Sequence, residues 1–544
     1  MQAIDLYSGI GGWTLGFKMA GIEIVSSYEW WRDANNTHNK NFGSTHAEVD
    51  IRKLKLEDLP DPETIDYVIG SPPCTQFSFA NRGGNGDIAD GLIDIHKFLE
   101  VVEYLKPKYW AMENVPRVAK ILEREIQDGG ALHRFKNLCT VIEVFDSSDF
   151  GVPQRRKRMI AGDFPVDLLH SYKTVTPHLT MGDVLHALSQ NPVVDPIYGL
   201  QLNQEEVTDN IPETPLSPEE ARINGDAKAY HTVYNKMSFP DQWDRPSRTI
   251  TALCTRVSRE SIIIQDHKGD LRRLSVRERG CLQSFPINYQ YFSGSYGGKL
   301  KMIGNAVPPV LTFYIAQCML ERKASEIVHP NQVEDQLVQK VEMPIIHNTE
   351  NRGAKYPWSR SFWLAIPGLR FGSGVRFEMR NYHDKRDQST SWKVNFFFGN
   401  SKNIRSKELN SDSFDSAMNI WSLMSDNILN DRLARAVAYF NDIDIAGLQK
   451  NWTNRDRDRV GPIELIDQIG VYCTTIKETL SKSTKNKETC SVFVEEVLRN
   501  GGGTLDNKRL LENSIEVFVG ILIGSCFNSI IDGKKVQLEL EPMV

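Results

Sequence analysis

The segment Ala3-Ile-Asp-Leu-Tyr-Ser-Gly-Ile-Gly-Gly12 is the clearest indication of fold class in this sequence. Ala3 to Leu6 is a short apolar strand, and a glycine turn joins it to a segment with helical spacing from Trp13 to Ala20. Glycines at such a turn let the backbone approach a ligand closely, and the following helix N-terminus favours a carboxylate or phosphate. A glycine turn alone is weak evidence of a site, because an ordinary surface turn has the same composition.

The alternation of strand and helix continues along the first part of the chain. A second strand is predicted to begin at Ile22 to Val25 and to end at Tyr28-Glu29-Trp30. Further strands are predicted at 65–70, 109–113 and 139–145, with helices at about 91–105 and 116–127. Strands that alternate with helices predict a parallel sheet covered by helices on both faces. The expected fold class is therefore α/β, with a Rossmann-like sheet.

Changes in composition divide the 544 residues into several parts. Residues 1–165 are predicted to form the catalytic and cofactor-binding domain, and the Pro-, Asn- and Asp-rich residues 166–275 a small irregular domain. Short strands are expected there at 247–253 and 261–265. Helical spacing then returns, and closing helices complete the first domain. The remaining parts are the return segment 276–325, a linker at 326–357 and a separate α+β domain at 358–544.

The overall composition is that of a globular protein, with 40% hydrophobic and 25% charged residues and a net charge of −6. No run of 18 apolar residues is seen, so no membrane span is expected, and no secretory signal is visible. The eight cysteines form no Cys-x-x-Cys pair, which predicts a reduced, intracellular protein. Lys236 to Cys281 holds ten Lys or Arg against six acids, a local basic excess.

Cys74 follows the predicted strand 65–70 in the run Gly70-Ser-Pro-Pro-Cys74. Glycine and proline end the strand and stiffen the backbone, which places the thiol at the sheet edge where α/β proteins bind ligands. Most free cysteines are small buried hydrophobes. Taken alone, the motif leaves both interpretations open.

Three residues suggest an adenosine-bearing cofactor. Glu29 ends the second strand, where a carboxylate can bind a ribose. Trp30 offers a flat face for a purine, and Asp50 can meet an adenine amino group. The alternative is a turn with surface acids.

Glu113 ends the strand 109–113, at the sheet edge expected for Cys74. Arg156 and Arg158 lie in a basic run, and residues two apart face the same side of an extended chain. Both arginines can therefore point into one site. A helix-capping acid and a solvated basic run are the alternatives.

These residues occur in an ordered set that resembles the cytosine-5 DNA methyltransferase family over about residues 2–325. The blocks that carry the resemblance are Asp5–Gly12, Glu29-Trp30, Asp50, Pro72-Pro73-Cys74-Thr75-Gln76-Phe77-Ser78, Gly91-Leu92, Glu113-Asn114-Val115, Gln154-x-Arg156-x-Arg158, Arg273–Glu278 with Leu282–Pro286, and Ile303–Pro308. Three departures are visible. Tyr7 stands where the family usually has Phe. Thr75 follows the cysteine at a position where Gln is common, and the glutamine of this chain, Gln76, comes one residue later. Val49 stands where the family usually has a glycine before the aspartate.

The resemblance implies a Rossmann-like sheet of the S-adenosylmethionine-dependent methyltransferases and a role for each matching residue. Cys74 would be the nucleophile, because a thiolate is a strong nucleophile near neutral pH. Glu113 would hold the cytosine N3 and amine and supply a proton, while Arg158, with Arg156, would bind the ring O2 and favour the thiolate. S-adenosylmethionine, which leaves as S-adenosylhomocysteine, would contact Tyr7, Gly9, Ile10, Gly11, Glu29, Trp30, Asp50, Ile51, Pro73, Leu92 and Asn305. No metal is expected.

The implied substrate is double-stranded DNA with a cytosine flipped out of the helix. Residues 166–275 would be the target-recognition domain, with base reading around Pro246 to Arg259. Members of this family commonly act in restriction-modification or phage defence in prokaryotes. The resemblance therefore implies such a role here, in the cytoplasm and in association with the nucleoid. The alternatives are a tRNA cytosine-5 methyltransferase and an inactive DNA-binding regulator.

The C-terminal extension has no counterpart in the resemblance. We expect an accessory domain that binds DNA or docks protein partners of a defence system. A fused nuclease is a weaker alternative, suggested by acids close to lysines in Asp532 to Glu541.

Overall fold

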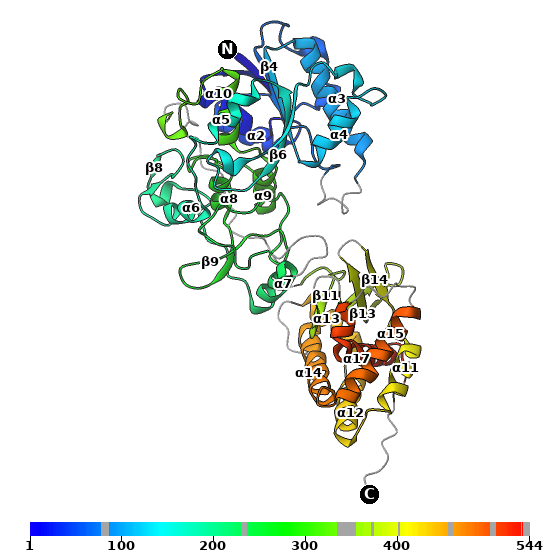
Figure 1. Cartoon of the computed structure of the whole chain (residues 1–544). Helices are drawn as coiled ribbons and strands as arrows, with labels where there is room; N and C mark the ends of the chain where they lie inside the picture. The colour runs from blue at the N-terminus through cyan, green and yellow to red at the C-terminus, as the bar shows by residue number, and fades with distance from the viewer. Residues whose placement is uncertain are drawn as a thin grey trace. The chain divides into compact units, whose positions relative to one another are not determined.

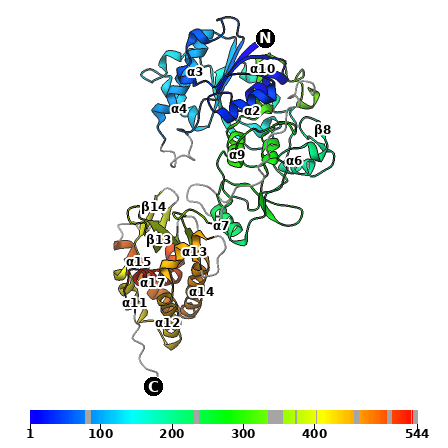
Figure 2. The ribbon, with the colours of Figure 1, turned by 180° about the vertical axis from the view of Figure 1, so that it is seen from behind.

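The computed structural model describes residues 1–77, 86–229, 237–333, 355–371, 375–400, 403–454, 461–500, 508–534 and 536. The chain forms two compact units. Unit 1 comprises residues 1–217 and 238–350, and unit 2 comprises residues 218–237 and 351–544 (Figures 1 and 2). Residues 218–237, which the sequence places inside the recognition domain, therefore belong to the unit formed by the C-terminal region.

Unit 1 is built on a six-stranded sheet with the order β2-β1-β3-β4-β6-β5. The strands β1, β2, β3 and β4 are parallel, as predicted. The prediction of an all-parallel sheet is wrong at one edge, because β6 runs antiparallel to both β4 and β5. Residues 147–156 join β5 to β6, and a parallel pair would need a longer crossover connection. The strands are β1 Gln2–Leu6, β2 Glu23–Tyr28, β3 Tyr67–Gly70, β4 Tyr109–Asn114, β5 Val141–Asp146 and β6 Lys157–Asp163.

Two layers of helices cover the sheet because successive strand residues face opposite sides. In β1, Ala3 packs into the core on one face, whereas Ile4 and Leu6 pack into the core on the other. Helices α3 and α4 lie on one face, and α2, α5 and α10 lie on the other (Figure 1). The helices of this part are α1 Gly12–Met19, α2 Arg32–Phe42, α3 Ile88–Leu105, α4 Arg117–Glu125, α5 Val166–Tyr172 and α10 Pro309–Met319.

The rest of unit 1 consists of short elements joined by long loops. The strand expected at 261–265 is present as β9, whereas 247–253 forms no strand and makes one isolated bridge, between Ser247 and Gln154. Residues at the start of the expected linker, including Ile327, Val328 and Val333, pack on the core of unit 1. These elements are α6 Met181–Leu188, β7 Val193–Val194, β8 Gln201–Leu202, β9 Ile263–Gln265, β10 Leu271–Arg273, α8 Val276–Leu282 and α9 Tyr296–Asn305.

Unit 2 combines an antiparallel sheet, in the order β11-β12-β13-β14, with helices, as the predicted α+β domain requires. Its apolar helix α17 is long enough to cross a membrane, but 89% of it is buried inside the fold, which explains its composition as that of a core helix. The elements are β11 Trp363–Arg370, β12 Arg376–His383, β13 Thr390–Asn400, β14 Asn403–Lys407, α7 Pro218–Ala229, α11 Ser411–Trp421, α12 Asn427–Asn441, α13 Ile445–Thr453, α14 Pro462–Leu480, α15 Thr484–Asn500, α16 Lys508–Glu512 and α17 Ser514–Ile531.

Most of the stretch that suggested a nuclease lies outside the described residues. The two described members that carry charge are already engaged: Asp532 pairs with Lys393 at 3.1 Å, and Lys534 donates to Ser411 Oγ at 2.7 Å. These contacts are those of an ordinary surface strand and helix end.

Candidate active site

The carboxyl ends of the parallel strands meet at one edge of the sheet, because Leu6 of β1 pairs with Gly70 of β3, which pairs with Met112 of β4. A pocket opens at this edge. It brings together all four predicted catalytic residues and seven of the predicted cofactor residues. These are Cys74, Glu113, Arg156 and Arg158, with Tyr7, Gly9, Ile10, Glu29, Trp30, Pro73 and Asn305.

Four predicted cofactor residues do not line this pocket. Gly11 has a φ of +87° and shapes the turn, since a Cβ there would lie 2.3 Å from the ring of Phe42. Ile51 is buried in the core below α3, and Leu92 packs against the same core. Asp50 is exposed, accepts a hydrogen bond from Arg52 N at 3.2 Å and pairs with Lys53.

The backbone that carries Cys74 is anchored on both sides. Asn114 at the end of β4 donates its Nδ2 hydrogen to Pro72 O at 3.1 Å. After the cysteine, Phe77 N donates to Cys74 O at 3.0 Å, and the Phe77 ring is fully buried against Gly91 of α3. A Cβ at position 91 would lie 2.5 Å from that ring, so only glycine fits there. Gly91 thus makes room for the Phe77 ring, and the buried ring holds the segment that carries Cys74 in place.

Glu113 and Arg158 form an ion pair in the pocket. Arg158 Nε lies 2.8 Å from Glu113 Oε1, and the two side chains are 13% and 8% exposed. Arg158 Nη1 also donates to Lys157 O at 2.7 Å. The pair therefore has a fixed geometry, which suits a carboxylate that must present one edge to a flat ring.

Arg156 lies at the same pocket but is engaged differently. Its Nη1 donates to Ile250 O at 2.9 Å, and its Nη2 donates to Gly304 O and Ala306 O at 2.8 and 2.9 Å. The side chain is 1% exposed. Arg156 thus clamps two distant segments onto the sheet with its terminal nitrogens.

The electrostatics around Cys74 work in opposite directions. Burial raises the pKa of the Cys74 thiol, the positive charge of Arg158 opposes this rise, and the negative charge of Glu113 adds to it. Burial is the largest of these effects, so the net pKa lies above the ordinary value of a thiol. The expectation that the arginines favour the thiolate is right in sign, but burial outweighs them.

At the other end of the pocket, Glu29 organises the glycine turn. Its Oε2 accepts a hydrogen bond from Gly9 N at 2.9 Å, and its Oε1 accepts one from Trp31 N at 2.7 Å. Burial raises the pKa of Glu29, and these backbone hydrogen bonds oppose the rise. The neighbouring Trp30 is 62% exposed, so much of its indole is accessible.

Several pocket residues were not predicted. Lys301 Nζ lies 4.7 Å from the ring centroid of Trp31, and both line the pocket. Trp13 Nε1 donates to Ser71 Oγ at 3.0 Å across the pocket floor. Trp31 directly follows Glu29-Trp30, and Lys301 lies close to the block Ile303–Pro308. This closeness in sequence is the signal from which both residues could have been predicted.

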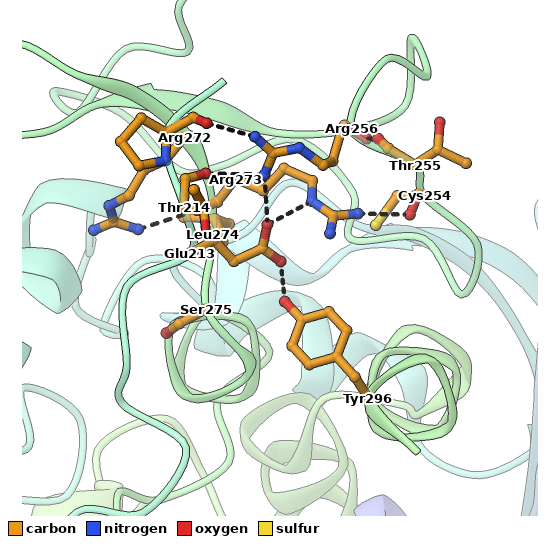
Figure 3. A network of polar contacts seen from close by, with 12 residues as sticks. Glu213, Thr214, Cys254, Thr255, Arg256, Arg272, Arg273, Leu274, Ser275 and Tyr296 are labelled. Carbon is orange, nitrogen blue, oxygen red and sulfur yellow. Dashed lines mark hydrogen bonds and ion pairs between the residues drawn. The ribbon is translucent and has the colours of Figure 1, made fainter. Parts of the chain in front are cut away.

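Five of the arginines in the basic stretch between Lys236 and Cys281 are buried inside the fold. Figure 3 shows Glu213 between Arg273 and Arg256, with Tyr296 pointing at its carboxylate. Arg273 Nε donates to Glu213 Oε2 at 2.7 Å, and Arg256 lies 3.6 Å from the same oxygen. Arg248 pairs with Asp241, Arg245 pairs with Asp244, and Arg272, Arg277 and Arg279 are buried.

Comparison with known proteins identifies the class. The family described as C-5 cytosine-specific DNA methylase matches residues 1–321, and the chain belongs to this family. It is 27% identical over 332 residues to the Type II methyltransferase M.NgoPII of Neisseria gonorrhoeae, covering 58% of this chain and 94% of that protein. It is 30% identical over 350 residues to the Type II methyltransferase M1.HphI of Haemophilus parahaemolyticus, covering 59% of this chain and 87% of that protein.

Among solved structures, the S. pombe Dnmt2 methyltransferase is 17% identical with a TM-score of 0.42, covering 59% of this chain and 98% of that one. The family match and the Type II relatives, and not this likeness, make the chain an S-adenosylmethionine-dependent DNA cytosine-5 methyltransferase. The family match ends at residue 321, before the C-terminal part of unit 2 begins.

Proposed function

We propose that Cys74 is the nucleophile of this methyltransferase, with Glu113 and Arg158 as its partners, and that the enzyme modifies a specific duplex sequence in a restriction-modification system. The observation that carries the assignment is the convergence of Cys74 with the Glu113–Arg158 pair in one pocket. The Type II relatives support the restriction-modification setting.

Carbon 5 of cytosine is a poor nucleophile until carbon 6 is attacked. The Cys74 thiolate adds to carbon 6, while Glu113 holds N3 and the exocyclic amine and supplies a proton as negative charge develops. Arg158, fixed by Glu113, faces the ring O2. Once carbon 5 has accepted the methyl group, a base (water in the open pocket) removes the carbon 5 proton, the 5,6 double bond re-forms and the Cys74 thiolate leaves carbon 6. Because the base must leave the duplex to reach Cys74, the reaction requires base flipping.

The residues at the other end of the pocket fit an adenosine carrying a charged amino-acid tail. A Cβ at Gly9 would meet nothing within 4 Å, so the turn leaves open space above it. Glu29 and the accessible face of Trp30 border that space and suit a ribose and a purine. S-adenosylmethionine, when bound, supplies an electrophilic methyl group to carbon 5. Asp50, Ile51 and Leu92 lie outside the pocket lining, and their contact with the cofactor remains our proposal.

Arg156 is better explained as a positioning residue than as a ligand of the base. Its three hydrogen bonds to backbone carbonyls hold Ile250, Gly304 and Ala306 beside the pocket. Asn305 lies between two of these anchored residues, so Arg156 fixes it at the cofactor end of the site.

Transfer of labelled methyl groups to duplex DNA tests the proposal. We expect Cys74→Ser to abolish transfer while it still binds S-adenosylhomocysteine, and bisulfite sequencing of DNA from expressing cells to show one modified sequence. Unchanged transfer by Cys74→Ser would refute the nucleophile assignment. Modification of tRNA but not DNA by the wild type would refute the proposed substrate.

A further inference from the structure

Arg52 lies two residues after Asp50 and binds two aspartates of α3. Its Nε and Nη2 donate to the Asp94 carboxylate at 2.9 and 2.7 Å. Its Nη1 donates to Asp90 Oδ1 at 2.8 Å. Asp94 is 4% exposed, and the guanidinium of the partly exposed Arg52 pairs with its carboxylate at two points, which fixes the geometry of the contact.

Each aspartate also binds a residue of a different loop. Gln76, two residues after Cys74, donates its Nε2 hydrogen to Asp90 Oδ2 at 3.1 Å, and its Oε1 accepts from Asp87 N at 3.0 Å. Tyr7 of the glycine turn donates its hydroxyl hydrogen to Asp94 Oδ1 at 3.2 Å. One arginine therefore connects the turn that carries the thiol with the turn at the cofactor end.

Both ends of this network are positions where the chain departs from the common family pattern. A phenylalanine at position 7 has no hydroxyl to donate to Asp94. Gln76 is the glutamine displaced by one position, and it points to α3 and does not line the pocket. The network is thus a property of this chain's own residues.

We propose that Arg52 is a positioning residue that couples occupancy of the cofactor end, through Tyr7 and Asp94, to the placement of the Cys74 turn, through Asp90 and Gln76. The inference rests on the proposed function of the two turns. Its consequence is reciprocal, because coupling between two sites acts equally in both directions. A change at Gln76 must alter cofactor affinity although Gln76 does not line the pocket.

Isothermal titration calorimetry with S-adenosylhomocysteine tests this without turnover. We expect Gln76→Met to weaken binding about three- to tenfold, the effect of losing one or two hydrogen bonds to charged or backbone groups. In an Arg52→Met background the same substitution should have no further effect, since the connection is already broken. Tyr7→Phe should likewise be non-additive with Gln76→Met, and this pair keeps the test valid if Arg52→Met fails to fold.

The matched control is Lys55→Met, which removes a neighbouring positive charge whose side chain is 70% exposed and pairs with Glu57. We expect its affinity to equal that of the wild type. Three results would each overturn the proposal: full additivity of Gln76→Met with Tyr7→Phe, unchanged affinity in Gln76→Met, or an equal loss of affinity in Lys55→Met. Methyl transfer by Cys74→Ser would instead refute the proposed function, so the two failures are distinguishable.

A second inference concerns α7, which lies within the predicted recognition domain in the sequence but belongs to unit 2. Arg222 donates two hydrogen bonds to Asp467 of α14 at 2.5 and 2.6 Å, and Arg360 donates to Glu219 at 3.2 Å. Ile223 packs against the core of unit 2. Glu220, Asn224 and Lys228, four residues apart, form a buried polar stripe.

A helix with so polar a buried face is not stable by itself. The rest of unit 2 supplies the charges and apolar surface that α7 requires. We infer that the C-terminal region is a structural part of target recognition, holding a segment of the recognition domain, and is not an independent effector. This inference rests on the proposed recognition role of residues 166–275.

Charge reversal in the full-length protein tests it. We expect Arg222→Asp and Asp467→Arg each to raise the KM for target DNA about threefold or more, and the double variant to restore it, while affinity for S-adenosylhomocysteine is unchanged. Ile223→Asp places a charge against the core of unit 2, and we expect it also to raise the KM for target DNA. The inference fails if the single variants lower the Tm but leave the KM for DNA and the modified sequence unchanged.

Discussion

Arg158 Nε lies 2.8 Å from Glu113 Oε1, and this ion pair lines the same pocket as Cys74. The two residues come from neighbouring antiparallel strands, β4 and β6, in which Glu113 pairs with Ile160. The connection that reverses β6 therefore brings the arginine to the carboxylate. An all-parallel sheet would place the arginine at the opposite edge.

The first prediction concerns this pair. Glu113→Gln should lower kcat at least about 100-fold, since it removes a group that donates a proton in the transition state. Affinity for S-adenosylhomocysteine should change little, because Glu113 lies at the other end of the pocket from Gly9. Steady-state methyl transfer and calorimetry measure the two effects. Equal fold losses in kcat and in affinity for S-adenosylhomocysteine would contradict the role assigned to Glu113.

The second prediction separates the two arginines. Arg156→Met should lower the free energy of unfolding by about 3 kcal/mol, because three buried carbonyls lose a charged donor. Arg158→Met should reduce kcat with a much smaller change in stability. Urea denaturation gives the first quantity and methyl transfer the second. If Arg156→Met and Arg158→Met lowered the free energy of unfolding equally, the stabilising role would not be specific to Arg156.

The third prediction is a pH dependence. Because burial raises the pKa of Cys74, the thiolate fraction is low at neutral pH, and the rate of alkylation of Cys74 by iodoacetamide should rise as pH increases. Arg158→Met removes the charge that opposes this shift, so its profile should move to higher pH. Peptide mass spectrometry follows the reaction at residue 74. A profile that moves to lower pH in the variant would refute the electrostatic account.

The fourth prediction concerns Asp5, whose pKa is raised by burial from 3.8 to about 8 despite hydrogen bonds from Thr14. Its folded-state pKa exceeds the unfolded value, so the associated stabilisation is complete below about pH 3.8 and is lost as pH rises towards about 8. The free energy of unfolding should therefore fall across this window, and Asp5→Asn should flatten the fall. Denaturation at several pH values would contradict this if both proteins had the same slope.

The fifth prediction concerns Gly91. A Cβ there would lie 2.5 Å from the buried Phe77 ring, so Gly91→Ala should displace the Cys74 turn and lower kcat about tenfold or more. Gly297→Ala in α9 is the matched control, because its Cβ would meet nothing within 4 Å. Kinetics of both variants check this. Equal kcat in Gly91→Ala and the wild type would show that Phe77 does not position the thiol.

The sequence predicted the strands and helices around the site because their apolar periods and glycine turns are local signals. Cys74, Glu113 and Glu29 could be placed at one edge of the sheet from the sequence, because each lies at or just after the end of a strand. The reversal of β6 was missed, since periodicity does not reveal strand direction. The engagement of Arg156 and the burial of Arg256 and Arg273 depend on partners distant in sequence, such as Gly304 and Glu213, which no local pattern contains.

The central claim is that the sulfur of Cys74 forms a transient bond to carbon 6 of a flipped cytosine. The most direct test incubates the full-length protein and S-adenosylmethionine with a random-sequence duplex library in which 5-fluorocytosine replaces cytosine, followed by peptide mapping of protein joined to DNA. The account predicts a permanent adduct on Cys74 with one preferred sequence. No adduct on any sequence, or an adduct that still forms in Cys74→Ala, would contradict it.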